Sequence, residues 1–408
     1  MRDGHLTGRS IFCIGMTQLI NWGITFYMPG VFGTAIMAEK GWSPVVTFSG
    51  LTVAMLVMGL VSPLTGYVIA RTGGRMMMMA GTFSITIGCF LMAITHSTAA
   101  WVAVWVLTGV GMRLALYDAA FALLVEIAGA GARRAVSLIT LLGGLASAVF
   151  WTAGAALLHI TDWRHALVVY GCAGLAGLLF LTAVPAGRRV NPPAVSRSVL
   201  PAAGMAEDRK GFISGLWYAA LIALLSFVST GVSTHFPRIL AAYGLPALAG
   251  MLWGAGQVSA RLLDVASGAR ISALRLNLIT GILLPLCFLA GLAGCVTPVA
   301  TVIFVLGYGA VNGLCTVVKA VLPLVLFDPQ QYARKTGVLL SPGFFLAALA
   351  PSSYAMLLER YGIPGTLLVS ALLTLFITAI SVVLWRRHSG SVVQSPDEKA
   401  PALPGENV

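Results

Sequence analysis

Long apolar segments alternate with short polar ones along the whole chain. Each apolar segment carries few or no charged residues. Each is also at least about 20 residues long, which is the length a helix needs to cross the hydrocarbon core of a bilayer. The pattern therefore predicts an all-α membrane protein with twelve transmembrane helices. The predicted helices cover residues 11–36, 45–70, 76–95, 98–127, 136–159, 166–186, 213–237, 245–266, 276–296, 298–327, 336–357 and 363–385.

The longest polar interruption, residues 187–212, falls in the middle of the chain and carries five basic residues. It divides the helices into an N-terminal bundle of six, residues 1–186, and a C-terminal bundle of six, residues 213–387. The tail at 388–408 is rich in proline and charge, which predicts a disordered cytoplasmic segment.

Composition and charge agree with a membrane protein and exclude a soluble enzyme. Of the 408 residues, 58% are hydrophobic and only 9% are charged. The net charge of +12 would indicate a nucleic-acid partner in a soluble protein. When both termini are placed in the cytoplasm, however, 18 of the 25 Lys and Arg residues fall in cytoplasmic segments. The positive-inside rule therefore predicts cytoplasmic termini, and we expect a lipid bilayer rather than nucleic acid as the partner.

Motifs of enzymes and cofactor sites are missing. The chain has no Walker loop, no Gly-x-Ser-x-Gly and no HExxH, so we expect no cofactor, no bound metal and no enzymatic activity. All the cysteines lie in predicted spans without a CxxC motif, and we expect them to be small buried apolar residues. They are Cys13, Cys89, Cys172, Cys287, Cys295 and Cys315.

The two halves repeat three short patterns in the same order. The glycines of helices 2 and 8, the Gly-x-Gly of helices 4 and 10, and the basic pairs before helices 5 and 11 recur at offsets of 195, 198 and 201 residues. A nearly constant offset indicates two related six-helix halves, an arrangement typical of many transporters. The pairs are Gly59 and Gly254, Gly73 and Gly268, Gly109 and Gly307, and Arg133 and Arg334.

The turn after helix 2 resembles the best-known motif of the major facilitator superfamily, Gly-x-x-x-Asp-Arg-x-Gly-Arg-Arg. Gly66, Arg71, Gly73 and Arg75 match it, whereas Ala70 replaces its acidic residue. The resemblance covers the whole transmembrane region. It implies two pseudo-symmetric six-helix bundles that expose a central site alternately to each side of the membrane, with the four matching residues in a gating turn.

Other positions place the chain within that resemblance. Trp105 stands where helix 4 of the family often has an arginine, and no Gly-Pro pair follows Gly143 in helix 5, so the antiporter signature is missing. The stretch from Gly256 to Arg261 and the sequence around His235 are similar to those of bacterial members from organic-anion-like branches. The resemblance implies a multi-pass protein of a bacterial cytoplasmic (inner) membrane, and we expect a monomer.

Polar residues inside the spans are the candidates for function, since a bilayer tolerates them only beside a cavity or a partner. Predicted helices 3, 6, 9 and 12 have no ionisable residue, and these are the helices that face lipid in the family resembled. Helical spacing arranges polar residues into stripes on helices 1, 8 and 10. The candidates for binding substrate are Arg113, Lys319, Asn312, Arg261, Gln257, Asn21 and Tyr117.

Coupling and gating have their own candidates. Asp118 and His235 are candidates for carrying a proton, because a buried acid or a histidine can titrate near neutral pH. Asp264, near the cytoplasmic end of helix 8, is a candidate gating residue.

Structural alternatives stay open for several of these residues. Arg261 could pair with Asp264, Arg113 could pair with Asp118, and His235 could be a hydrogen-bonded interface residue. Glu126 could form an ion pair with Arg133 and Arg134.

The balance of buried charge points to the substrate. Three cations in the spans, Arg113, Arg261 and Lys319, face two acids away from the helix ends, Asp118 and Asp264. This excess favours a secondary active transporter of a small organic anion, a carboxylate, coupled to protons. The alternative is an efflux pump for amphipathic drugs or metabolites. A third possibility is a membrane sensor or assembly factor built on a transporter scaffold.

Overall fold

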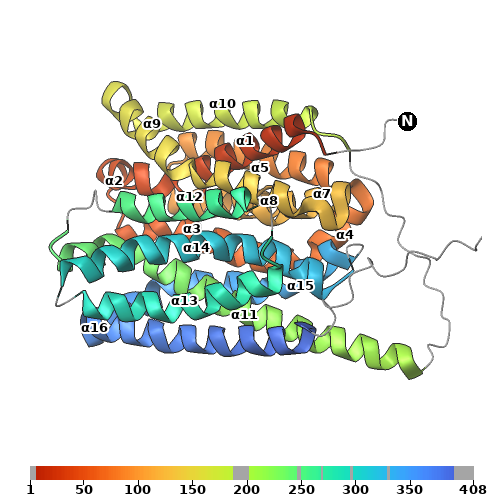
Figure 1. Cartoon of the computed structure of the whole chain (residues 1–408). Helices are drawn as coiled ribbons and strands as arrows, with labels where there is room; N and C mark the ends of the chain where they lie inside the picture. Colours follow the sequence, from red (N-terminus) through yellow and green to blue (C-terminus); the bar gives the residue numbers. More distant parts are fainter. Residues whose placement is uncertain are drawn as a thin grey trace, which may run out of the picture.

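The computed structural model of the chain describes residues 6–186, 202–245, 250–267, 270–294, 297–328 and 331–389. These residues are almost entirely helical and contain no strand, which confirms the all-α prediction. The helices run roughly side by side in one elongated bundle (Figure 1). Ten helical segments of the described residues are long and apolar enough to cross a membrane, so the chain is a multi-pass membrane protein.

The first group of helices precedes residue 187, and within it α5 packs on α6 and α10, α3 on α6, and α1 on α8 and α10. Its elements are α1 Gly8–Ile24, α2 Met28–Lys40, α3 Pro44–Val61, the 3-10 helix η1 Ser62–Leu64, α4 Thr65–Thr72, α5 Gly74–Ile94, α6 Thr98–Ala115, α7 Tyr117–Ala128, the 3-10 helix η2 Gly129–Ala132, α8 Arg133–Gly144, α9 Ala146–Ile160 and α10 Trp163–Thr182.

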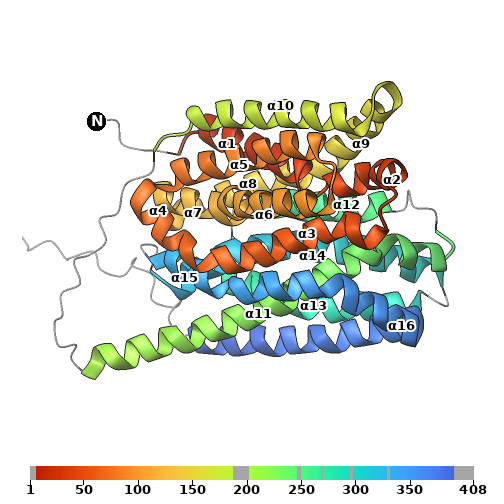
Figure 2. The ribbon, with the colours of Figure 1, turned by 180° about the vertical axis from the view of Figure 1, so that it is seen from behind.

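The second group follows residue 201, and within it α11 packs on α16, α12 on α14, and α13 on both α14 and α16. Its elements are α11 Ala202–Ala242, α12 Gly250–Ala266, α13 Ala273–Ala293, α14 Pro298–Leu326, α15 Tyr332–Leu339 and α16 Ser341–His388. The two groups meet along α3 and the first part of α16 (Figure 2), along α8 and α12, and where α15 lies against α4 and η1.

Several predicted helices are divided in the structure. The predicted helix 11–36 breaks between α1 and α2, where Pro29 opens the second helix because it has no backbone N–H to donate. The predicted helix 98–127 breaks at Leu116, whose extended backbone separates α6 from α7. In contrast, the last two predicted helices are joined in α16, which is interrupted only by the non-helical backbone of Gly362, with φ 63°.

Some predictions fall outside the described residues. They are the linker from 187 to 201, the tail from 390 to 408, the burial of Cys295, and the repeat glycine Gly268. Helix α11 begins at Ala202, within the predicted linker. The prediction that every cysteine is buried is wrong for Cys172, which is exposed, because its position on α10 faces away from the neighbouring helices.

Helices α5 and α6 approach each other through paired glycines. A Cβ on Gly81 would lie 2.8 Å from backbone atoms of α6, and a Cβ on Gly111 would lie 2.8 Å from the Gly81 carbonyl oxygen. Small residues at such contacts allow two backbones to come close, which is how helices associate in lipid without a hydrophobic driving force.

Gly81→Ala is expected to destabilise the protein by about 1–3 kcal/mol, because the added methyl meets backbone that cannot move aside. Thermal unfolding in detergent measures the change. Gly177→Ala is the matched control, since its Cβ would make an ordinary 3.5 Å contact with Thr82 Cγ2. Equal stability of the two variants would show that the α5–α6 contact is looser than described.

Candidate functional site

A cavity of about 410 Å³ lies between the two groups of helices. Aromatic and aliphatic side chains make up most of its wall, and its polar residues come mainly from α7, α11, α12 and α14. The break at Leu116 places Tyr117 and Asp118 at the start of α7, where both line the cavity. The aromatic lining residues are Trp22, Phe26, Tyr27, Tyr117, Phe121, Trp151, Trp253, Tyr308 and Phe344.

The Arg261 side chain reaches from α12 of the second group to α8 of the first. All three of its guanidinium nitrogens donate hydrogen bonds. Nε donates to the Gly313 carbonyl at 3.3 Å and Nη1 to the Thr140 carbonyl at 2.9 Å, while Nη2 reaches Thr316 Oγ1 at 3.4 Å. Among the described residues no carboxylate forms an ion pair with it, so Arg261 is not paired with Asp264. The residue is only 3% exposed, yet it lines the cavity.

The glycine pair at the end of α8 makes room for these contacts. A Cβ on Gly144 would clash with Arg261 Nη1, and a Cβ on Gly143 would clash with Tyr117 Oη. Tyr117 Oη donates to the Thr140 carbonyl at 3.2 Å, the same oxygen that Arg261 uses. The glycines therefore let two donors reach one carbonyl.

Lys319 and Asp118 form an ion pair between α14 and α7 in the cavity wall. Nζ lies 2.9 Å from Oδ1 and 3.2 Å from Oδ2, with the side chains 25% and 10% exposed. This pair joins the two groups of helices. Asp118 is therefore paired with Lys319 and not with Arg113. Each charge in the pair is largely neutralised by the other.

The other predicted binding residues divide between the cavity and the helix interior. Asn312 and Gln257 line the cavity, and Asn312 Oδ1 accepts a hydrogen bond from Ser229 at 2.8 Å. Asn21 is fully buried and donates to Thr82 Oγ1 at 3.0 Å, so it joins α1 to α5 and does not line the cavity. His235 Nε2 lies 2.8 Å from the Pro351 carbonyl oxygen, also outside the lining.

Arg113 lies behind the cavity wall. Its Nε donates to Ser62 Oγ at 3.0 Å and its Nη2 to Thr65 Oγ1 at 3.2 Å, and Ser62 in turn donates to the Gly337 carbonyl of the second group at 2.5 Å. The guanidinium is 3% exposed. Arg113 therefore orients a hydroxyl that joins the two groups and does not reach the central cavity.

The polar contacts between the groups lie toward one end of the bundle, where α4, α7 and α15 are found (Figure 1), here named the closed end. Asp264 accepts from Ser137 Oγ at 2.5 Å and lies 3.7 Å from Arg133 Nη2, both on α8. Ser341 Oγ donates to the Gly59 carbonyl at 2.7 Å. The cavity continues from here toward the opposite end, where Trp151 is half exposed.

The predicted gating turn contributes one residue to this interface. A Cβ on Gly66 would lie 2.5 Å from Arg334 Cα, so only glycine allows α4 and α15 to approach this closely. Arg71 lies over the Tyr67 ring, and Arg75 donates to the Val184 carbonyl at 3.1 Å, both within the first group. Gly73, with φ 81°, separates α4 from α5 in a backbone conformation that favours glycine.

A comparison with known sequences now identifies the family. The Major Facilitator Superfamily profile matches residues 11–323. The chain belongs to the major facilitator superfamily. Proteins of this superfamily transport small molecules across membranes, so a central cavity with its polar contacts gathered at one end is the expected site of transport.

The solved structures agree with this family. The crystal structure of the human organic anion transporter MFSD10 (TETRAN) matches with a TM-score of 0.66 at 16% identity. The match covers 91% of this chain and 99% of that chain, which shows a shared fold. No curated protein sequence matches the chain significantly.

Three residues at the contacts between the two groups of helices were not predicted from the sequence. Gly144, Ser62 and Ser137 join or accommodate contacts between the groups, but serine and glycine are common in helix contacts and no spacing separates these from the rest. Glu126 was expected to pair with Arg133 and Arg134. Instead its Oε2 accepts from the Gly74 backbone N–H at 2.7 Å, near the start of α5, where a carboxylate is favourable.

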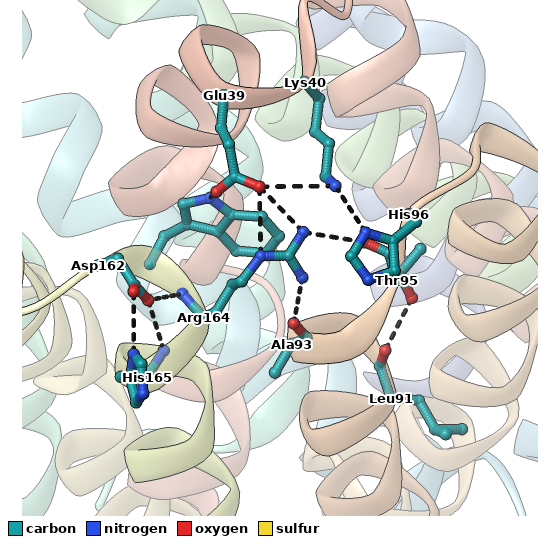
Figure 3. A network of polar contacts seen from close by, with 10 residues as sticks. Glu39, Lys40, Leu91, Ala93, Thr95, His96, Asp162, Arg164 and His165 are labelled. Atoms are coloured by element: carbon teal, nitrogen blue, oxygen red, sulfur yellow. Dashed lines mark hydrogen bonds and ion pairs between the residues drawn. The ribbon is translucent and has the colours of Figure 1, made fainter.

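A separate polar network lies at the opposite end of the first group (Figure 3). Arg164 Nη2 pairs with Glu39 Oε1 at 3.0 Å and donates to the Thr95 carbonyl at 3.3 Å, and Arg164 Nη1 donates to the Ala93 carbonyl. Hydrogen bonds from the backbone and then the ring of His165 lower the pKa of the Asp162 carboxyl, which begins α10. The network ties the ends of α2, α5 and α10 together.

Gly144→Ala is expected to open the closed end, because the new methyl takes the place of the Arg261 guanidinium. In a background without the native cysteines, a thiol placed at Thr140, which is fully buried, reports the opening. Its labelling by a water-soluble reagent should be several-fold faster in the Gly144→Ala protein. Gly254→Ala on α12 is the control, since its Cβ would meet nothing within 4 Å. Unchanged labelling would remove Gly144 from the closing contact.

Proposed function

We propose that the protein is a secondary active transporter of a small organic anion, a carboxylate, which moves by alternating access of the two groups of helices. The observation that carries this proposal is the state of Arg261. Its guanidinium lines the cavity and is held by carbonyl and hydroxyl oxygens, with no carboxylate paired to it among the described residues. A buried cation without a counter-charge favours an anionic ligand.

The other charges around the cavity also favour a negatively charged ligand. Lys319 is paired with Asp118, and Arg133 is paired with Asp264 near the closed end. The charged residues that line the cavity, Asp118, Arg261 and Lys319, therefore leave one positive charge in excess. A carboxylate can accept two hydrogen bonds from a guanidinium, which adds geometry to charge.

The arrangement of contacts supports alternating access. The chain would cross the membrane twelve times if α12, with 17 residues, and the two parts of α16 on either side of Gly362 are each one crossing. Both termini would then lie on one side, at the closed end. With the termini in the cytoplasm of a bacterium, the structure corresponds to a state closed toward the cytoplasm, with the cavity directed outward.

Asp118 is the group we assign to proton coupling. Protonation of its carboxyl would break the ion pair between α7 and α14 and leave Lys319 charged in the cavity. One proton would then both weaken a link between the groups and raise the affinity for an anion. His235 is less suitable, because its ring is bonded to the Pro351 carbonyl outside the cavity lining.

Export of amphipathic compounds is the second candidate. The predominance of aromatic and aliphatic side chains in the cavity wall favours a ligand with an apolar body. Direction of transport distinguishes the two candidates in cells: loss of the protein reduces growth on an imported acid but increases sensitivity to an exported one.

Arg261→Gln is expected to lower anion uptake into proteoliposomes at least about tenfold, since a charge-assisted hydrogen bond contributes about 1.5–3 kcal/mol. Uptake of labelled monocarboxylates and dicarboxylates is the measurement. Arg261→Lys should retain part of the uptake, because it keeps the charge but not the two-pronged geometry. Arg360→Gln is the control, because Arg360 is an exposed residue in the middle of α16 and lies outside the cavity lining. Full uptake by a folded Arg261→Gln protein contradicts the proposal.

Asp118→Asn is expected to abolish anion-driven proton movement while anion exchange between the two sides continues. The amide cannot release a proton, and it leaves Lys319 free to attract the anion. A pH-sensitive dye inside the liposomes and labelled anion outside measure both processes in one sample. Glu359→Gln, on the exposed face of α16, should leave both unchanged. Proton movement that persists in Asp118→Asn assigns the coupling to another group.

A further inference from the structure

We infer that the cavity takes an aromatic monocarboxylate. The inference rests on the proposed function and narrows its substrate class. Two features of the cavity carry it: aromatic side chains on both walls, and one cation, Arg261, that has no carboxylate partner among the described residues and has N–H groups to spare.

Aromatic rings line both walls. In the first group the Trp22 ring lies 5.4 Å from Phe26 and 5.0 Å from Tyr117. In the second group Trp253 and Tyr308 are stacked, with ring centroids 6.5 Å apart and planes at 13°. All five residues line the cavity. A planar apolar ring between such walls gains stacked and edge-to-face contacts that an aliphatic chain does not make.

The donors of Arg261 fit one carboxylate. A guanidinium has five N–H groups. One each on Nε, Nη1 and Nη2 is already used within the protein, which leaves one on Nη1 and one on Nη2 for the two oxygens of a carboxylate. A second carboxylate on the same ligand would have to lie against the aromatic walls or beside the ion pair of Lys319 and Asp118, where the Asp118 carboxylate repels it. Both positions are unfavourable for a second negative charge, so the cavity selects a monoanion.

The dimensions agree with a ligand of this kind. A cavity of about 410 Å³ is within the range of pockets that enclose small organic ligands. Gln257 and Asn312 flank Arg261 in the lining and add amide groups beside the site of the carboxylate. The remainder of the wall is mostly aromatic and aliphatic, with hydroxyl groups of α11 among its polar members.

The test measures binding to the full-length purified protein with a panel of probes. The probes are benzoate, hexanoate, succinate, benzamide and benzylamine. Ligand-induced thermal stabilisation and inhibition of uptake are the measurements. The expected order of affinity is benzoate and then hexanoate, with no binding of succinate, of the uncharged benzamide or of the cationic benzylamine.

Tryptophan variants test the aromatic walls. Trp22→Leu and Trp253→Leu keep an apolar side chain in the lining but remove the ring. Each should reduce the preference for benzoate over hexanoate by about two- to tenfold, the value of one aromatic contact.

The outcomes separate this inference from the proposed function. Binding and uptake of succinate or hexanoate in preference to benzoate would overturn the aromatic monocarboxylate and leave an anion transporter. Binding of benzamide or benzylamine without any acid would overturn the anion transporter itself. An unchanged preference for benzoate over hexanoate in Trp22→Leu and Trp253→Leu would falsify the role of the aromatic walls.

Discussion

The burial of one guanidinium between two groups of helices is the constraint on which the remaining arrangement depends. Arg261 can leave water only because the Gly313 carbonyl on its own side and the Thr140 carbonyl across the interface accept its donors. That requirement fixes the close approach of α8 and α12, and with it the need for glycine at position 144. The excess positive charge of the cavity and the closure of one end thus have a common physical cause.

The fold could be predicted from the sequence because its cause is local composition. A span must satisfy its own backbone hydrogen bonds in lipid, so a long uncharged segment indicates a helix. The breaks were harder to predict. Pro29 is visible in the sequence, but the extended Leu116 is not, because the carbonyl of Ala115 at the end of α6 accepts from Gln18 Nε2 of α1 at 2.7 Å, a contact between distant residues.

The ionisable residues of the candidate site could be predicted from the sequence, but their ion-pair partners could not. Ionisable residues in spans indicated Arg261, Lys319 and Asp118, and all three line the cavity. Helical spacing could not show that Asp118 pairs with Lys319 of the other group, because the relative rotation of two helices depends on every contact between them. Asn21 and Arg113 looked equally functional in the sequence, yet each donates hydrogen bonds to hydroxyl groups away from the cavity.

The shared carbonyl of Thr140 has a further consequence for the energetics of switching. Tyr117 Oη and Arg261 Nη1 both donate to it, one from within its own group and one from across the interface. When the groups separate, Tyr117 keeps its bond, so no orphaned acceptor is left on α8. Separation then costs one of two bonds and not the desolvation penalty of a stranded carbonyl. The second donor at this carbonyl therefore keeps the closed and separated states close in free energy.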